Sequence, residues 1–222
     1  MPSGLTRFHH SGQSHFVTFC CYHRRRSFTT DASRRIFESA LERVRRSFRL
    51  SVYGYVVMPE HIHLLLSEPQ QDTSSDRTAP LKPKPGLSGP PVLLSEPQQD
   101  TLADALKSLK QGVSRRLIGE ADHFWQKRYY DFNIRNYPQF VEKLRYIHRN
   151  PVKAGLCERP EDWEWSSFRH YATGCEGRVE IESEWTARKR ERAAGRLCPA
   201  VERGGWPALA HVARVGFRKA ES

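Results

Sequence analysis

Two histidines stand one residue apart in the stretch MPEHIHLLL, at His61 and His63. The surrounding apolar run is typical of a strand, and on a strand side chains two residues apart point to the same face. We expect both imidazoles to project together while Ile62, Leu64 and Leu66 face a core. Two adjacent imidazoles can hold one divalent metal ion, but an isolated H-x-H pair is more often solvated surface. The pair therefore needs further ligands from elsewhere in the chain.

A second candidate group lies in YPQFVEKLRYIHRN, where Tyr146 and Asn150 are four residues apart. This spacing puts both residues on one face of a helix. A tyrosine hydroxyl beside a metal-bound phosphate can attack phosphorus and form a covalent ester, and an amide oxygen suits a hard cation as a third ligand. The alternative is structural, with Tyr146 as a boundary packing residue and Asn150 as a helix cap ahead of Pro151. For either residue alone, the structural interpretation is favoured.

The elements that must position these groups alternate along the chain. Apolar and β-branched runs predict strands over residues 15–22, 52–58, 62–66 and 124–135, with a hairpin at Pro59. Helical spacing of apolar residues predicts helices over residues 36–48, 102–117 and 137–150, the last ended by Pro151. The order β-α-β-β-α-β-α predicts an α+β ferredoxin-like sandwich, with an antiparallel sheet of four to five strands and helices packed mainly on one face.

A direct repeat interrupts this pattern. LLSEPQQDT occurs at residues 65–73 and again at residues 93–101, and the segment between the copies is rich in proline and polar residues. Removing residues 74–101 would leave a strand, a short loop and a helix, which indicates a proline-rich insertion in a surface loop. A functional flap over the site is the alternative. We predict a catalytic domain over residues 1–171, interrupted by this loop, and a basic, partly disordered C-terminal extension over residues 172–222.

Composition favours a partner rich in phosphate. Lys and Arg number 36 against 25 Asp and Glu, and the formal charge is +11. No apolar run is long enough to span a bilayer, no signal peptide is evident, and five cysteines without a C-x-x-C motif are expected to be reduced, so a cytoplasmic location is predicted. The basic residues expected near the site, as candidates for binding a nucleic-acid backbone, are Arg24, Arg25, Arg26, Lys107, Lys110, Arg115, Arg116, Lys127 and Arg128.

Several motifs in order resemble one family. VVMPEHIHLLL, FWQKRYYDFNIRN, YIHRNPVKAGL and WEWSSFRHY together are similar to the REP-associated tyrosine transposases, relatives of small insertion-sequence transposases that carry an HUH (His-hydrophobe-His) motif and one catalytic tyrosine. The resemblance covers about residues 16–171 apart from the inserted loop. It implies that His61 and His63 bind metal, that Asn150 is the third ligand, and that Tyr146 is the nucleophile.

The resemblance also implies the activity. It implies a transposase that uses Mg²⁺ or Mn²⁺ to cleave and rejoin single-stranded DNA at palindromic hairpin (REP-like) elements, through a 5′-phosphotyrosine link and a free 3′-hydroxyl. Such an enzyme would be nucleoid-associated, a monomer or homodimer, with no membrane partner. Two alternatives remain: a non-catalytic module of the same fold that binds single-stranded nucleic acid, and a two-histidine phosphoesterase that uses water. The first would leave no covalent product, and the second would release free product without a protein adduct.

Overall fold

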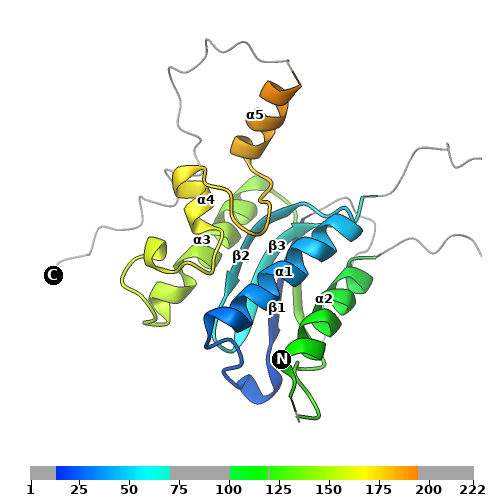
Figure 1. The fold of residues 1–222 in the computed structure, drawn as a ribbon. Coiled ribbons are helices and arrows are strands. Elements are labelled where there is room, and N and C mark those ends of the chain that lie inside the picture. Colours follow the sequence, from blue (N-terminus) through cyan, green and yellow to red (C-terminus); the bar gives the residue numbers. More distant parts are fainter. Residues whose placement is uncertain (1–13, 71–100, 120, 195–222) are drawn as a thin grey trace, which may run out of the picture.

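The computed structural model describes residues 14–70, 101–119 and 121–194. Of the predicted insertion, only Thr101 lies within the described residues, and the tail after residue 194 lies outside them as well. Figure 1 shows a sheet with helices packed against it. The predicted α+β class with an antiparallel sheet is confirmed.

Four antiparallel strands form the sheet in the order β2-β3-β1-β4. They are β1 (Ser14–Cys20), β2 (Val52–Val57), β3 (His61–Ser67) and β4 (Tyr130–Ile134). The tight connection through Pro59 makes β2 and β3 a hairpin, as predicted, and β3 also pairs with β1 over its whole length. This register sets His63 opposite Thr18 and His61 opposite Cys20.

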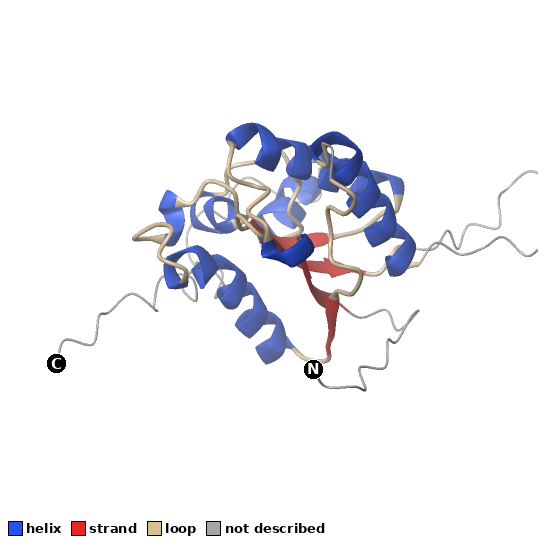
Figure 2. Cartoon of the chain, turned by 90° about the horizontal axis from the view of Figure 1, so that it is seen from below, coloured by secondary structure: helices blue, strands red, loops and turns tan. Residues whose placement is uncertain are grey.

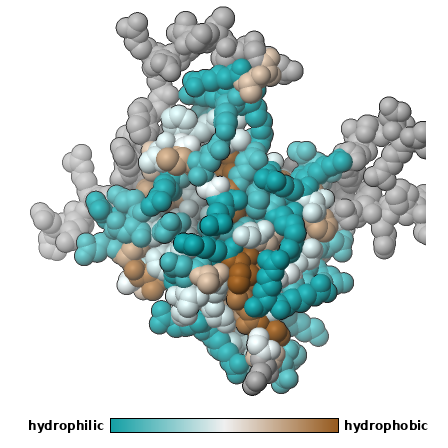
Figure 3. Space-filling view, viewed as in Figure 1, coloured by the Kyte–Doolittle hydropathy of each residue, from teal (hydrophilic) through white to brown (hydrophobic). Residues whose placement is uncertain are grey.

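The helices cover both faces of the sheet (Figure 2). Helices α1 (Asp31–Ser47) and α2 (Leu102–Leu117) pack together over one face, and Ile62, Leu64 and Leu66 are fully buried. A threonine, Thr30 or Thr101, caps the start of each helix. Its hydroxyl accepts a hydrogen bond from the backbone N–H three residues later, which would otherwise lack a partner within the helix. The surface over these two helices is largely hydrophilic (Figure 3).

Helix α3 (Tyr137–Lys153) packs on the opposite face, against β2 and β3. A glycine permits this close approach, because a Cβ atom at Gly54 would stand 2.6 Å from Leu144 Cδ1 of α3. Leu144 and Ile147 are buried against the sheet. The histidine-bearing face of β3 and the tyrosine-bearing helix are thus brought together.

The prediction that Pro151 ends this helix is wrong, since α3 continues to Lys153. Pro151 has no N–H to donate to the preceding turn, but its own carbonyl accepts a 2.9 Å hydrogen bond from Leu156 N–H. Ala154 N–H donates to Asn150 O over 3.0 Å, and Gly155 follows in the left-handed region with φ 67°. These bonds stabilise one more helical turn beyond the proline.

The fourth strand is shorter than predicted. Only Tyr130–Ile134 pairs with β1, whereas the preceding residues contribute a single bridge between Trp125 and Cys21. The Trp125 indole N–H donates to Lys110 O over 2.9 Å, and its ring lies edge-on to Phe19 at 5.0 Å. This tryptophan therefore closes the core beneath α2 instead of extending the ladder.

The chain after α3 covers the β2 edge of the sheet. It forms short helices at η2 (Pro160–Asp162) and α4 (Phe168–Thr173), and a bridge joins Ser166 to Val56. Farther on, Val179 and Ile181 are buried, and Glu182 N–H donates to Val52 O over 2.8 Å. Residue 171, the predicted boundary, lies within α4, and described residues on both sides of it pack into the same core.

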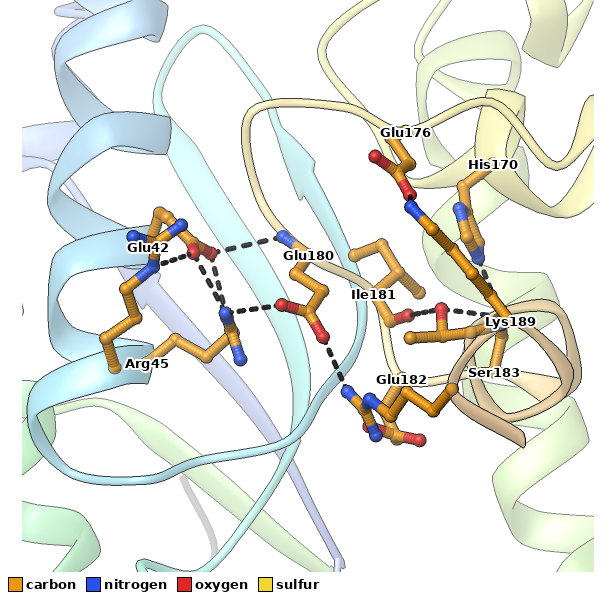
Figure 4. Close-up of polar contacts among 12 residues, drawn as sticks. Glu42, Arg45, His170, Glu176, Glu180, Ile181, Glu182, Ser183 and Lys189 are labelled. Atoms are coloured by element: carbon orange, nitrogen blue, oxygen red, sulfur yellow. Dashed lines mark hydrogen bonds and ion pairs between the residues drawn. The ribbon is translucent and has the colours of Figure 1, made fainter. Parts of the chain in front are cut away.

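Ion pairs fasten this extension to α1 (Figure 4). Arg45 of α1 donates to the Glu180 carboxylate over 2.8 Å, and the Glu180 backbone N–H donates to the Glu42 carboxylate over 3.1 Å. Arg190 of the exposed helix α5 (Glu184–Ala193) donates to Glu180 at 2.5 Å.

Among the described residues, none of the helices combines the length and apolar character needed to cross a bilayer.

Candidate metal and tyrosine site

The two histidines of β3 meet at their outer nitrogens. His61 Nε2 lies 3.0 Å from His63 Nε2, and the two rings are nearly perpendicular. His63 is buried with 4% exposure and stacks on Phe16, with ring centroids 5.5 Å apart. The two outer nitrogen atoms are therefore directed at one point, and the neighbouring strand β1 supports the ring of His63.

The inner nitrogens have partners that orient the rings. His61 Nδ1 lies 3.0 Å from the Glu60 carboxylate, and His63 Nδ1 lies 2.7 Å from Thr18 Oγ1. A carboxylate only accepts, so His61 carries its proton on Nδ1 and presents a lone pair at Nε2. The Thr18 hydroxyl can accept as well as donate, so His63 can take the same tautomer when a cation faces its Nε2.

Burial keeps both histidines neutral. Burial lowers the pKa of His63 to about 3, and the nearby charge of His61 acts in the same direction. Burial also lowers the pKa of His61, although the Glu60 carboxylate opposes this shift. At neutral pH both rings are therefore unprotonated at one nitrogen, which is the form that binds metal.

Asn150 completes the group from the other side. Its side chain is buried with 9% exposure, and the amide nitrogen lies 3.2 Å from His63 Nε2. A half-turn of the amide would put the oxygen at the same place, since the two amide positions are nearly equivalent in shape. An imidazole pair and an amide oxygen then converge, which suits a divalent cation with open positions for further ligands.

The described residues contain no second cluster of side chains typical of a metal site. Groups of three or more His, Cys, Asp or Glu side chains close enough to share an ion are absent from this part of the chain. The described cysteines are free, and burial raises the pKa of the Cys21 thiol to about 11. The predicted metal ligands therefore stay His61, His63 and Asn150.

Tyr146 stands beside the histidine pair and remains accessible. Its ring centroid lies 5.1 Å from that of His63 and 5.8 Å from that of Phe16, in edge-to-face arrangements. The side chain is 39% exposed. A hydroxyl on a fixed but accessible ring can reach a phosphate held at the histidines, so the predicted nucleophile and the predicted ligands lie in one place.

The basic residues predicted to surround the site divide into two groups. Arg24, Arg25 and Arg26, which follow β1, and Lys127 and Arg128, which precede β4, are exposed near the end of the sheet that carries His61. Arg24 has a φ of 54° and lies close enough to His61 for its charge to lower the pKa of that histidine, after the larger effect of burial. These basic side chains are therefore placed where they can contact the backbone of a nucleic acid that enters the site.

The α2 residues do not lie at the site, and their predicted position beside it is wrong. Helix α2 packs on the sheet face opposite His63, because its apolar stripe faces α1 and the reverse side of the strands. Lys110 is partly buried and donates from Nζ to Gln126 O over 3.0 Å, and burial lowers its pKa. The residues in this group are Lys107, Lys110, Arg115 and Arg116.

Sequence reasoning missed four contributors to the site. Thr18 and Phe16 could have been suspected from strand alternation, but their pairing with His63 depends on register. Glu60 directly precedes His61, a signal that was available. Lys153, whose Nζ lies 5.6 Å from the centroid of the Tyr146 ring, was missed because the helix was expected to stop at Pro151.

Comparison with known proteins identifies relatives. The sequence model of a family described as "Transposase IS200 like" matches residues 9–83. A protein of Haemophilus influenzae named as a REP-associated tyrosine transposase is 28% identical over 158 residues, covering 71% of this chain and 80% of its own. The REP-associated tyrosine transposase of Escherichia coli is 26% identical over 167 residues, covering 75% of this chain and 82% of its own.

A solved structure has the same fold. It is a REP-associated tyrosine transposase bound to a REP hairpin, with a TM-score of 0.56 and 22% sequence identity. The match covers 82% of this chain and 93% of the other. The resemblance indicated by the ordered motifs is thus confirmed, both in sequence relatives and in fold.

Proposed function

From the premise that this chain is a relative of the REP-associated tyrosine transposases, we propose that it cleaves and rejoins single-stranded DNA at hairpin elements through a 5′-phosphotyrosine intermediate. One observation carries the proposal. The outer nitrogens of His61 and His63 and the Asn150 amide converge beside the accessible ring of Tyr146. The similarity to these transposases supports the reaction class, and the convergence of these side chains supports this location for it.

Three residues of the site would bind the metal, and a fourth would attack the DNA phosphate. His61, His63 and Asn150 would hold Mg²⁺ or Mn²⁺, with Thr18 and Glu60 fixing the two rings. A bound divalent cation would polarise a phosphodiester and spread its developing charge. Hard cations of this kind accept amide oxygen and water alongside imidazole.

Tyr146 would form the covalent link. Its hydroxyl oxygen attacks phosphorus, a P–O bond to tyrosine forms, and the bond from phosphorus to the 3′-oxygen breaks. The tyrosine proton is lost to solvent, and the departing 3′-oxygen takes up one proton to become a hydroxyl. The number of phosphoester bonds is unchanged, so the reverse attack by a 3′-hydroxyl can rejoin strands without ATP.

The surface around the tyrosine suits unpaired DNA. Tyr130 is 44% exposed on the same sheet face and lies 6.3 Å from Phe16, which in turn contacts Tyr146. Unpaired bases stack on such rings while nearby arginine and lysine neutralise the backbone. The bound REP hairpin in the related solved structure favours a hairpin with a single-stranded end as the partner here.

A single incubation tests the proposal. The full chain is mixed with hairpin-bearing single-stranded DNA labelled at either end, with Mn²⁺ or with a chelator, and run on a denaturing gel. We expect a Mn²⁺-dependent protein–DNA adduct that retains the label 3′ of the cut, and a free fragment ending in a 3′-hydroxyl. Binding without an adduct would favour the non-catalytic module, and cleavage without an adduct would favour a water-using phosphoesterase.

A further inference from the structure

The helical turn beyond Pro151 brings a lysine to the tyrosine. Lys153 lies seven residues after Tyr146, nearly on the same side of α3, and its Nζ stands 5.6 Å from the centroid of the tyrosine ring. The side chain is exposed. Its position depends on the helix continuing through the proline, because a chain that turned away at residue 151 would carry the ammonium group elsewhere.

The charge of Lys153 has no carboxylate partner among the described residues. Lys143, on the other side of Tyr146 along the same helix, differs in this respect. Its Nζ lies 3.0 Å from the Glu142 carboxylate and 5.0 Å from the centroid of the Phe132 ring. Of these two lysines flanking the tyrosine, Lys153 is therefore the one whose charge is not already balanced.

The end of α3 would otherwise disfavour phosphate. The last turn of a helix carries about half a negative charge on its free carbonyl groups, and Asn150 and Lys153 both lie in that turn. A DNA phosphate placed between His63 and Tyr146 would approach this negative end. An ammonium group there offsets the repulsion and can donate to phosphate oxygens.

We propose that Lys153 binds a backbone phosphate of the DNA strand at Tyr146 and so positions the strand for attack. The proposal deepens the proposed function and rests on it. It assigns a DNA contact to a residue outside the histidine, asparagine and tyrosine group. Its ligand is a phosphodiester of single-stranded DNA, not a base.

Binding measurements test the contact without any chemistry. In a Tyr146→Phe background with chelator present, affinity for hairpin-bearing single-stranded DNA is measured across a range of salt concentrations. The slope of log K against log salt is negative, and loss of one phosphate contact reduces its magnitude by about 0.7 for a single strand of DNA. We expect Lys153→Gln to reduce the magnitude of the slope by this amount and Lys153→Arg to preserve it.

Lys107 provides the matched control. It is an exposed lysine on α2, on the opposite face of the sheet, so Lys107→Gln removes the same charge far from Tyr146. An unchanged slope for Lys107→Gln beside a reduced slope for Lys153→Gln supports the proposal. Equal slopes for the two variants would overturn it, because the effect would then be one of net charge.

Adduct formation gives a second readout. At saturating DNA with Mn²⁺, we expect Lys153→Gln to slow the adduct by about 10- to 100-fold, the range for a hydrogen bond to a charged group, and Lys153→Arg to recover most of the rate. An unchanged rate with Gln would overturn the positioning role. If the unaltered protein forms no adduct, the proposed function fails, and the salt slopes alone decide whether Lys153 contacts phosphate.

Discussion

Thr18 Oγ1 and His63 Nδ1 are joined across β1 and β3 by a hydrogen bond of 2.7 Å. The bond links a ring nitrogen on one central strand to a hydroxyl on the other, so the sheet itself aims His63 Nε2. Glu60 orients His61 from within its own segment. The proposed metal-binding geometry is thereby supported by groups that would not touch the metal.

Removing the Thr18 hydroxyl should weaken metal binding without unfolding the protein. Thr18→Val keeps the side-chain shape, and loss of such an outer partner typically costs about 10- to 100-fold in metal affinity. Calorimetric titration with Mn²⁺ in the absence of DNA measures the effect. Thr18→Ser, which restores a hydroxyl, is the control. An affinity for Mn²⁺ that is unchanged in Thr18→Val would show that the hydrogen bond does not orient a ligand.

Tyr146→Phe should abolish the covalent adduct and leave DNA affinity within a few-fold. The change removes one hydroxyl and almost no volume, and no neighbouring group can form the same ester. Tyr130→Phe and Tyr137→Phe are the controls, since both tyrosines are exposed and close in sequence, and both variants should still form the adduct. Mass spectrometry of the DNA-linked peptide from the unaltered protein identifies the attached residue. A link to any residue other than Tyr146 would contradict the assignment.

Two glycines should respond in opposite directions to alanine. At Gly54, a Cβ atom would stand 2.6 Å from Leu144 Cδ1 and 3.3 Å from Ser167 Oγ, so Gly54→Ala forces α3 or its side chains away from β2. Overpacking of this kind costs about 1–3 kcal/mol. Urea denaturation should show this loss, together with slower adduct formation because α3 carries Tyr146.

Gly112 lies inside α2, and a Cβ atom there meets only the end of the Arg43 side chain, which is exposed and can move aside. Alanine in a helix interior is favoured over glycine by about 1 kcal/mol. Gly112→Ala should therefore leave stability unchanged or raise it slightly. A large loss at Gly112, or none at Gly54, would contradict the packing described for α2 and α3.

A buried charge cluster should make stability depend on pH. His15 Nδ1 lies 2.9 Å from the Asp131 carboxylate and Nε2 lies 3.3 Å from the Glu68 carboxylate. Burial alone would lower the pKa of His15, but the bonds and charges of Asp131 and then Glu68 outweigh it, so the pKa is raised above 6.5. The folded protein therefore holds this proton more tightly than the unfolded chain.

This stabilisation is complete below the unfolded value of 6.5 and is lost as the pH rises through the higher folded value. In urea unfolding from pH 6 to pH 9, we expect His15→Gln to lack this decline and to be less stable at pH 6 by about 1–3 kcal/mol. Circular dichroism would follow the transitions. Parallel pH profiles for the two proteins would show that His15 is not charged in the folded state.

Local signals predicted some elements well. The range 102–117 matches α2, because its apolar residues recur at helical spacing within one short segment. The hairpin at Pro59 and the shared face of His61 and His63 follow from the same kind of local pattern. These features depend on periods of two or of about four residues, which a sequence displays directly.

Features set by tertiary packing could not be found in this way. The side of the sheet that α2 covers follows from how the chain crosses over the strands, so its four basic residues were misplaced. The aromatic run at Trp125 looked like a strand, but burial beneath α2 prevails over strand propensity there. Pro151 was taken as a stop, although α3 continues to Lys153 and ends only before Gly155, whose positive φ is typical of a helix end.

The two edges of the sheet are unequal in what they can accept. Along β2, the backbones of Trp165, Ser167 and Glu182 already occupy hydrogen-bonding positions, while in the described part of the chain β4 is paired on one side only. An open strand edge is a template for another extended segment. Of the two edges formed by the described residues, β4 is therefore the one whose outer backbone groups are not already bonded to another segment, and exposed Tyr130 lies on it.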